Sequence, residues 1–191
     1  MKRRFLFSLL SAFVASALLF SFSSCSKGSD DDDDDIDVNI DVNIDEQVLS
    51  CFETINTFRT SNTWQWDEGN TTQVPVTGRA AFVLDEDLCR VASIRARELV
   101  QNFDHTRPNG SGCFTAFSEA GVSLSPAGEC IAAGYSTGVS VANGWREEDK
   151  NYAGQGHRRI LLAAGATRVG IAYVYSPGSS YGYYWALVTS Y

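Results

Sequence analysis

The chain has no excess of basic residues. Its 15 lysines and arginines face 23 aspartates and glutamates, which gives a formal net charge of −8. It also has no glycine-rich loop of the kind that cradles phosphate groups. Without a basic stripe or such a loop, the sequence argues against nucleic-acid binding.

The acidic excess is confined to one short segment. Ten of the acidic residues lie between Asp30 and Glu46, and Asp30 to Asp35 are consecutive aspartates. From Gln47 onward, 11 basic residues face 13 acidic ones. A run of like charges repels itself and cannot be buried, so we predict a solvated linker followed by a nearly neutral domain.

Histidine is scarce, with only His105 and His157 in the whole chain. Two imidazoles alone cannot supply the three protein ligands that are usual for a catalytic zinc ion. Two glutamates, Glu129 and Glu148, lie between them in motifs of their own. Two histidines and two glutamates that converge in the fold would form either a metal site or an acid/base site.

The start of the chain has the pattern of a secretory signal. Basic residues 2–4 precede an apolar run over residues 5–20, and small residues lead to Cys25. This cysteine resembles the one that is lipidated in bacterial lipoproteins. We therefore expect residues 1–24 to be a lipoprotein signal peptide and Cys25 to anchor the protein to the outer membrane. An ordinary signal peptide, or a membrane span of minimal length, is the alternative.

Residues 25–45 are expected to be the lipidated cysteine and a flexible acidic linker. An acidic run directly after a lipidated cysteine resembles the surface-export signal of some Gram-negative lipoproteins. That resemblance implies exposure at the cell surface, whereas a plain spacer would leave the face of the membrane undecided.

Residues 46–191 are predicted to form one domain of ordinary size. The domain contains four cysteines, and an even number in an exported domain favours two disulfides among three possible connectivities. We expect Cys51 to pair with Cys89 and Cys113 to pair with Cys130.

The hydrophobic pattern of the domain predicts helices on both sides of a sheet. Apolar residues recur at helical spacing in residues 46–60, and Asp85 can cap a second helix that ends near Asn102. Residues 168–176 and 183–190 alternate as two strands joined by a turn. Both faces of these strands are apolar and need cover. We therefore predict an α+β fold, a three-layer α/β/α sandwich with a mainly antiparallel central sheet.

The sequence Gly134-Tyr135-Ser136-Thr137-Gly138 matches the nucleophile elbow of α/β-hydrolases. That fold needs several preceding strand–helix units, and the sequence shows none. We therefore interpret Ser136 or Thr137 as the N-cap of a helix rather than as a nucleophile.

Four short motifs occur in a fixed order along the domain. They are Phe103-Asp104-His105, Gly128-Glu129-Cys130-Ile131-Ala132, Trp145-x-x-Glu148-x-x-x-Tyr152 and Gly156-His157-Arg158. With the C-terminal pair of strands, they resemble the CAP superfamily, also called SCP-like, which includes cysteine-rich secretory proteins, antigen 5 and pathogenesis-related proteins. The resemblance covers residues 46–191.

The resemblance implies that His105, Glu129, Glu148 and His157 surround one cleft. Glu148 rather than Glu147 matches the family motif, because it stands three residues after Trp145. We expect the domain to be a monomeric binding module, and an enzyme is the alternative. The implied ligands are a divalent metal such as zinc, held by His105 and His157, or a lipid or sterol-like molecule, and a host or envelope protein is a further possible partner.

The same four residues also suit other roles. They could act as general acids and bases in a peptidase or another hydrolase. They could equally form a structural polar network that holds the loops together. The sequence leaves these alternatives open.

Overall fold

The computed structural model describes residues 42–148 and 155–191. The expected signal peptide, the lipidated Cys25 and the acidic run lie outside the described residues. Within those two ranges, no helix is both long and apolar enough to cross a membrane.

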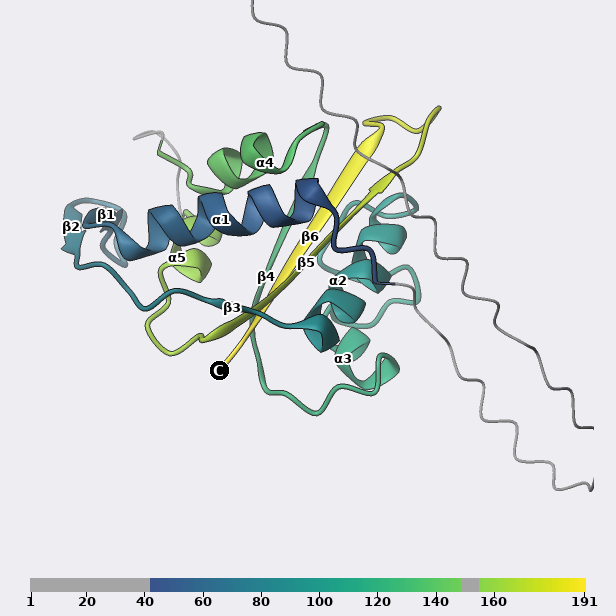
Figure 1. The fold of residues 1–191 in the computed structure, drawn as a ribbon, viewed down its shortest axis with the longest axis horizontal. Helices are drawn as coiled ribbons and strands as arrows, with labels where there is room; N and C mark the ends of the chain where they lie inside the picture. The colour runs from purple at the N-terminus through teal and green to yellow at the C-terminus, as the bar shows by residue number, and fades with distance from the viewer. Residues whose placement is uncertain (1–41, 149–154) are drawn as a thin grey trace, which may run out of the picture. The chain divides into compact units, whose positions relative to one another are not determined.

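A four-stranded sheet forms the centre of the domain (Figure 1). Its strands, in order across the sheet, are β3 (Val83–Leu84), β5 (Arg168–Tyr175), β6 (Tyr183–Ser190) and β4 (Pro126–Ala133). Strand β6 pairs antiparallel with both β5 and β4, whereas β3 pairs parallel with β5. The sheet is therefore mainly antiparallel, as the sequence predicted.

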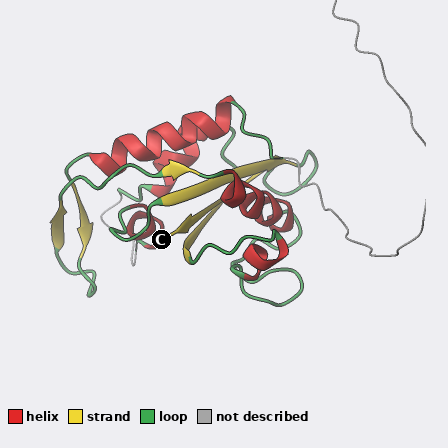
Figure 2. Cartoon of the chain, turned by 60° about the horizontal axis from the view of Figure 1, so that its bottom comes forward, coloured by secondary structure: helices red, strands yellow, loops and turns green. Residues whose placement is uncertain are grey.

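Helices cover both faces of this sheet (Figure 2). On one face, α1 (Glu46–Thr60), α4 (Gly138–Trp145) and α5 (Gly156–Leu161) contribute to one hydrophobic core. On the other face, α2 (Glu86–Leu99) and α3 (Thr115–Glu119) contribute to a second core. The predicted α/β/α sandwich is confirmed.

Strand β6 shows why both faces of the sheet need helices. Trp185 and Leu187 belong to the core beneath α1, whereas Ala186 and Val188 belong to the core beneath α2. All four side chains are almost completely buried. Because successive side chains of a strand point to opposite faces, an apolar strand of this kind stabilises two layers at once.

A hairpin stands beside the sandwich, within residues 62–79. Strands β1 (Thr63–Trp66) and β2 (Gln73–Val76) pair antiparallel. The buried Arg158 of α5 fastens this hairpin, since its guanidinium donates to the Trp64 carbonyl over 2.7 Å and to the Thr63 hydroxyl over 2.8 Å. The hairpin is thus held to the helix that carries His157.

Polar side chains start the helices where the sequence predicted. The carboxylate of Asp85 accepts a hydrogen bond from the Leu88 N–H at the start of α2. Thr137 caps α4 in a capping box with Ser140. The N-cap interpretation of Ser136 or Thr137 is therefore confirmed at Thr137.

The structure corrects the expected disulfides, because all four cysteines of the domain carry free thiols. Cys130 lies in the core beneath α1, together with Cys51. The neighbouring β4 residue Glu129 points to the opposite face, where Cys113 lies close to its carboxylate. Strand alternation therefore turns Cys130 away from Cys113. Cys51 and Cys89 are likewise separated, since α1 and α2 cover opposite faces of the sheet (Figure 2).

Candidate functional site

The first histidine pairs with a buried glutamate of the central sheet. His105 lies in the loop after α2, and Glu129 lies in β4. The imidazole Nδ1 is 2.6 Å from the Glu129 Oε2 atom. The Glu129 side chain is almost fully buried, whereas 55% of the His105 side chain is exposed. The bond to Glu129 raises the pKa of His105 above its ordinary value, although partial burial opposes the shift.

A buried arginine holds Glu129 in place. The Arg95 Nε atom donates to Glu129 Oε1 over 2.6 Å, and its terminal nitrogens bond to Glu98 and to the Asp104 carbonyl, the latter over 2.9 Å. Arg95 is completely buried. Burial lowers its pKa, but the bonds to the two carboxylates outweigh that effect and the net shift is upward. One guanidinium therefore fixes the strand, the helix and the His105 loop relative to one another.

Cys113 completes a second group around the same glutamate. One ligand atom from each of His105, Cys113 and Glu129 can be chosen so that all three lie within 4.8 Å of one another. Burial and the neighbouring Glu129 charge raise the pKa of the Cys113 thiol to about 11. Cys113 is therefore protonated at neutral pH and is a poor nucleophile in this state. From the sequence, Cys113 was expected to form a disulfide with Cys130, and its position beside Glu129 was not predicted.

The second histidine pairs with Glu147 rather than with Glu148. The His157 Nδ1 atom is 2.7 Å from Glu147 Oε1, and the Glu147 side chain is only 5% exposed. The other carboxylate oxygen accepts from the Arg158 N–H over 3.2 Å. Glu148 instead forms an ion pair with Arg146, and 56% of its side chain is exposed.

The backbone explains this exchange of neighbouring glutamates. Helix α4 ends at Trp145, so a helical spacing from Trp145 to Glu148 does not apply. Glu147 then has a φ of 47°, a left-handed conformation that few residues other than glycine adopt. Gln155 holds this turn, because its buried side-chain amide donates to the Glu147 carbonyl over 2.6 Å.

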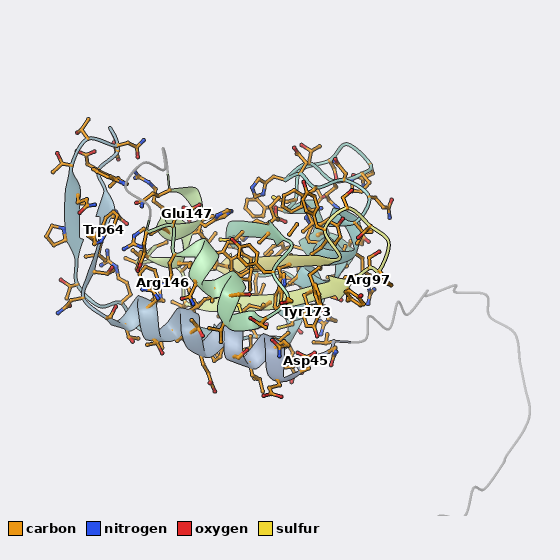
Figure 3. All side chains as sticks on the ribbon, turned by 90° about the horizontal axis from the view of Figure 1, so that it is seen from above. Asp45, Trp64, Arg97, Arg146, Glu147 and Tyr173 are labelled. Atoms are coloured by element: carbon orange, nitrogen blue, oxygen red, sulfur yellow. The ribbon has the colours of Figure 1, made fainter. Side chains whose placement is uncertain are left out.

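A pocket of about 470 Å³ opens beside the second pair. His157, Glu147 and Glu148 form its polar side, and Trp145 lies close to them. Phe103, Tyr135 and Tyr181 are aromatic residues of its wall. Figure 3 shows Glu147 next to Arg146, between α4 and the hairpin that carries Trp64. His105 and Glu129 do not belong to the pocket wall.

Each imidazole is oriented in the same way. In both pairs, Nδ1 faces a buried carboxylate, which leaves Nε2 for a ligand or a metal. A carboxylate that accepts from Nδ1–H is the usual orienting partner of a metal-bound histidine, so these residues fit a divalent metal. The same orientation also suits an imidazole that moves protons.

This fold and these histidine–glutamate pairs define a CAP-type domain. A model described as "Cysteine-rich secretory protein family" (CAP) matches residues 52–189. The chain belongs to this family.

Relatives share the domain rather than the whole protein. The uncharacterized protein YkwD of Bacillus subtilis is 30% identical over 101 residues, which are 52% of this chain and 37% of YkwD. An extracellular SCP-domain protein of Bacillus anthracis has a TM-score of 0.52 at 23% identity, over 75% of this chain and 40% of that protein. This chain thus spans well under half the length of both relatives.

Two further structures share the fold at lower identity. An outer surface protein of Borrelia burgdorferi has a TM-score of 0.56 at 16% identity and covers 78% of this chain and 95% of its own. NaASP2, solved with Zn²⁺, has a TM-score of 0.50 at 16% identity, over 76% of this chain and 79% of its own.

Proposed function

We propose that this protein is an exported CAP-domain binding module of the cell envelope or surface, and that its pocket takes a small molecule with an apolar body and a polar end. The proposed location rests on the signal-like N-terminus and the acidic run after Cys25. An extracellular protein and an outer surface protein among the structural neighbours support it.

The pocket beside His157 carries the proposal for the ligand. Its volume of about 470 Å³ lies within the range of roughly 300–1,000 Å³ that is typical of small-molecule sites. Aromatic side chains supply an apolar wall, and the oriented His157 supplies a hydrogen-bonding group at one side. A lipid or sterol-like molecule has this combination of apolar body and polar end.

Two exposed phenylalanines offer a matched test. Phe103 lines the pocket and is 42% exposed, whereas Phe114 is 41% exposed and is not part of the pocket wall. Binding of a fluorescent fatty acid and of a fluorescent sterol would be measured by titration. We expect Phe103→Ala to weaken binding of one probe by about tenfold and Phe114→Ala to leave it unchanged, since each lost aromatic contact removes buried apolar area. Equal affinity in both variants, or no binding of either probe, would contradict the proposal.

The paired histidines favour a divalent metal as a second ligand. Both imidazoles are oriented by buried carboxylates, and the neighbour NaASP2 was solved with Zn²⁺. Calorimetric titration with Zn²⁺ of the wild type and of the His105→Ala and His157→Ala variants tests this reading. A heat of zinc binding that both substitutions abolish would support a shared two-histidine site. No heat of binding in the wild type would contradict this metal site.

A further inference from the structure

We infer that His105, Cys113 and Glu129 form a site for a thiophilic transition-metal ion such as zinc, separate from any site that the two histidines share. The three residues come from three segments: the loop after α2, the loop before α3, and strand β4. Their ligand atoms already lie within 4.8 Å of one another. This site does not use His157, and it goes beyond the proposed binding of a small molecule.

The spacing of these atoms suits one ion. Zinc binds thiolate sulfur at about 2.3 Å and imidazole nitrogen or carboxylate oxygen at about 2.0–2.2 Å, so two ligands on opposite sides of the ion are at most about 4.6 Å apart. The set already lies within 4.8 Å, but the 2.6 Å hydrogen bond between His105 Nδ1 and Glu129 Oε2 must open, with the imidazole proton on Nε2, before both groups can bind the same ion. Sulfur, imidazole and carboxylate together favour zinc or a similar transition metal over calcium or magnesium, which prefer oxygen ligands.

The surroundings hold the carboxylate and balance the charges. Arg95 donates to Glu129 Oε1, so the carboxylate cannot turn freely, and Oε2 faces the imidazole. The Arg95 charge is also compensated by Glu98, which pairs with Arg107 as well. The single positive charge of Arg95 is thus shared between two carboxylates and does not fully neutralise Glu129. Glu129 therefore keeps negative charge that can attract a cation. Coordination would convert the Cys113 thiol into a thiolate and release its proton to solvent.

The site is accessible to an ion from solution. The His105 side chain is 55% exposed and Cys113 is partly exposed, whereas the Glu129 side chain is buried. Three protein ligands at the surface leave a fourth position for water or another ligand. Cys51, Cys89 and Cys130 are completely buried, so Cys113 is the thiol of the described domain that an incoming ion can reach.

Cobalt substitution distinguishes this site from a two-histidine site. Co²⁺ would be added to the reduced full chain and to its Cys113→Ser and His157→Ala variants, and near-ultraviolet absorption would report sulfur-to-cobalt charge transfer. We expect this band in the wild type and in His157→Ala, and its loss in Cys113→Ser with affinity reduced by more than about tenfold. Cys113→Ser changes one partly exposed atom, and thermal unfolding confirms that the variant is folded.

Each other outcome decides against the inference. A charge-transfer band that persists in Cys113→Ser would place the sulfur ligand elsewhere. Cobalt binding without a sulfur band, abolished by His157→Ala, would support a two-histidine site and overturn this one. No cobalt binding to the wild type would overturn both metal sites while leaving the small-molecule pocket untouched.

Discussion

The Nδ1 atom of His157 lies 2.7 Å from a carboxylate oxygen of Glu147, and the adjacent Glu148 points to Arg146 instead. This one-residue difference decides which glutamate pairs with His157. Glu147 is buried and bonds both to His157 and to the Arg158 N–H, whereas Glu148 is mostly exposed.

Substitution of the two glutamates should therefore have unequal effects on stability. We expect Glu147→Ala to lower the free energy of unfolding by about 1–3 kcal/mol, because it leaves buried donors without their acceptor. Glu148→Ala should change it by less than about 0.5 kcal/mol, as is usual for exposed side chains. Urea unfolding followed by circular dichroism measures both values. Equal losses in the two variants would contradict this assignment.

The titration of His105 should depend on Glu129. Because the folded-state pKa of His105 is raised, the His105–Glu129 pair contributes stability at pH below the unfolded value near 6.5, and that contribution disappears as the pH rises through the folded-state pKa. With only two histidines in the chain, proton NMR in the presence of a chelator resolves each imidazole. We expect the His105 midpoint above 6.5 in the wild type and lower in Glu129→Gln. Glu147→Gln is the matched control, and an unmoved midpoint in Glu129→Gln would refute the pairing.

Replacement of Arg95 by methionine or by lysine should lower the free energy of unfolding. Its guanidinium reaches Glu129, Glu98 and the Asp104 carbonyl from a completely buried position. Arg95→Met removes the guanidinium from the buried Glu129 carboxylate, and breaking a buried pair in this way costs about 3–5 kcal/mol. Arg95→Lys should also be destabilising, because one ammonium group cannot reproduce the planar fork. Chemical unfolding measures both, and a near-neutral Arg95→Lys would show that the fork geometry is unimportant.

The pocket should narrow when Gly144 acquires a side chain. A Cβ atom built at Gly144 would lie 2.5 Å from the Tyr135 hydroxyl oxygen, so the Tyr135 ring must move. Both residues line the pocket, and Gly144 lies within α4, where alanine is favoured over glycine by about 1 kcal/mol. We expect Gly144→Ala to weaken binding of the fluorescent lipid probe several-fold without lowering the melting temperature. Unchanged affinity would mean that Tyr135 does not contact the ligand.

The sequence predicted the sandwich well because its strands are apolar on both faces. Residues 183–190 admit only one arrangement that buries Trp185 and Val188 together, with a helical layer on each side. The choice between Glu147 and Glu148 was not predictable in the same way. It depends on where α4 ends and on a left-handed residue other than glycine, and neither has a clear sequence signal.

The cysteine pairing failed for a related reason. Counting cysteines gives possible connectivities but not the face of a strand, and Cys130 and Glu129 take opposite faces of β4.

Buried arginines connect distant segments of the domain by hydrogen bonds that the sequence analysis did not predict. Arg59, for example, donates to the carbonyls of Ala80, Leu161 and Ala166 at 2.6–2.7 Å. A buried arginine with carbonyl partners far along the chain has no short sequence motif.

The four thiols of the domain should react very unequally with an alkylating reagent. Cys51, Cys89 and Cys130 are completely buried, whereas Cys113 is partly exposed with a pKa of about 11. In the native protein without metal, we expect slow alkylation at Cys113 alone among these four, because little thiolate is present at neutral pH. In urea all four should react rapidly, which peptide mass spectrometry measures without a reducing agent. Zn²⁺ added to the native protein should slow the Cys113 reaction further, since a coordinated sulfur is less available to the reagent. Failure of Cys113 and Cys130 to react in urea until a reductant is added would restore the disulfide between them and exclude Cys113 as a metal ligand.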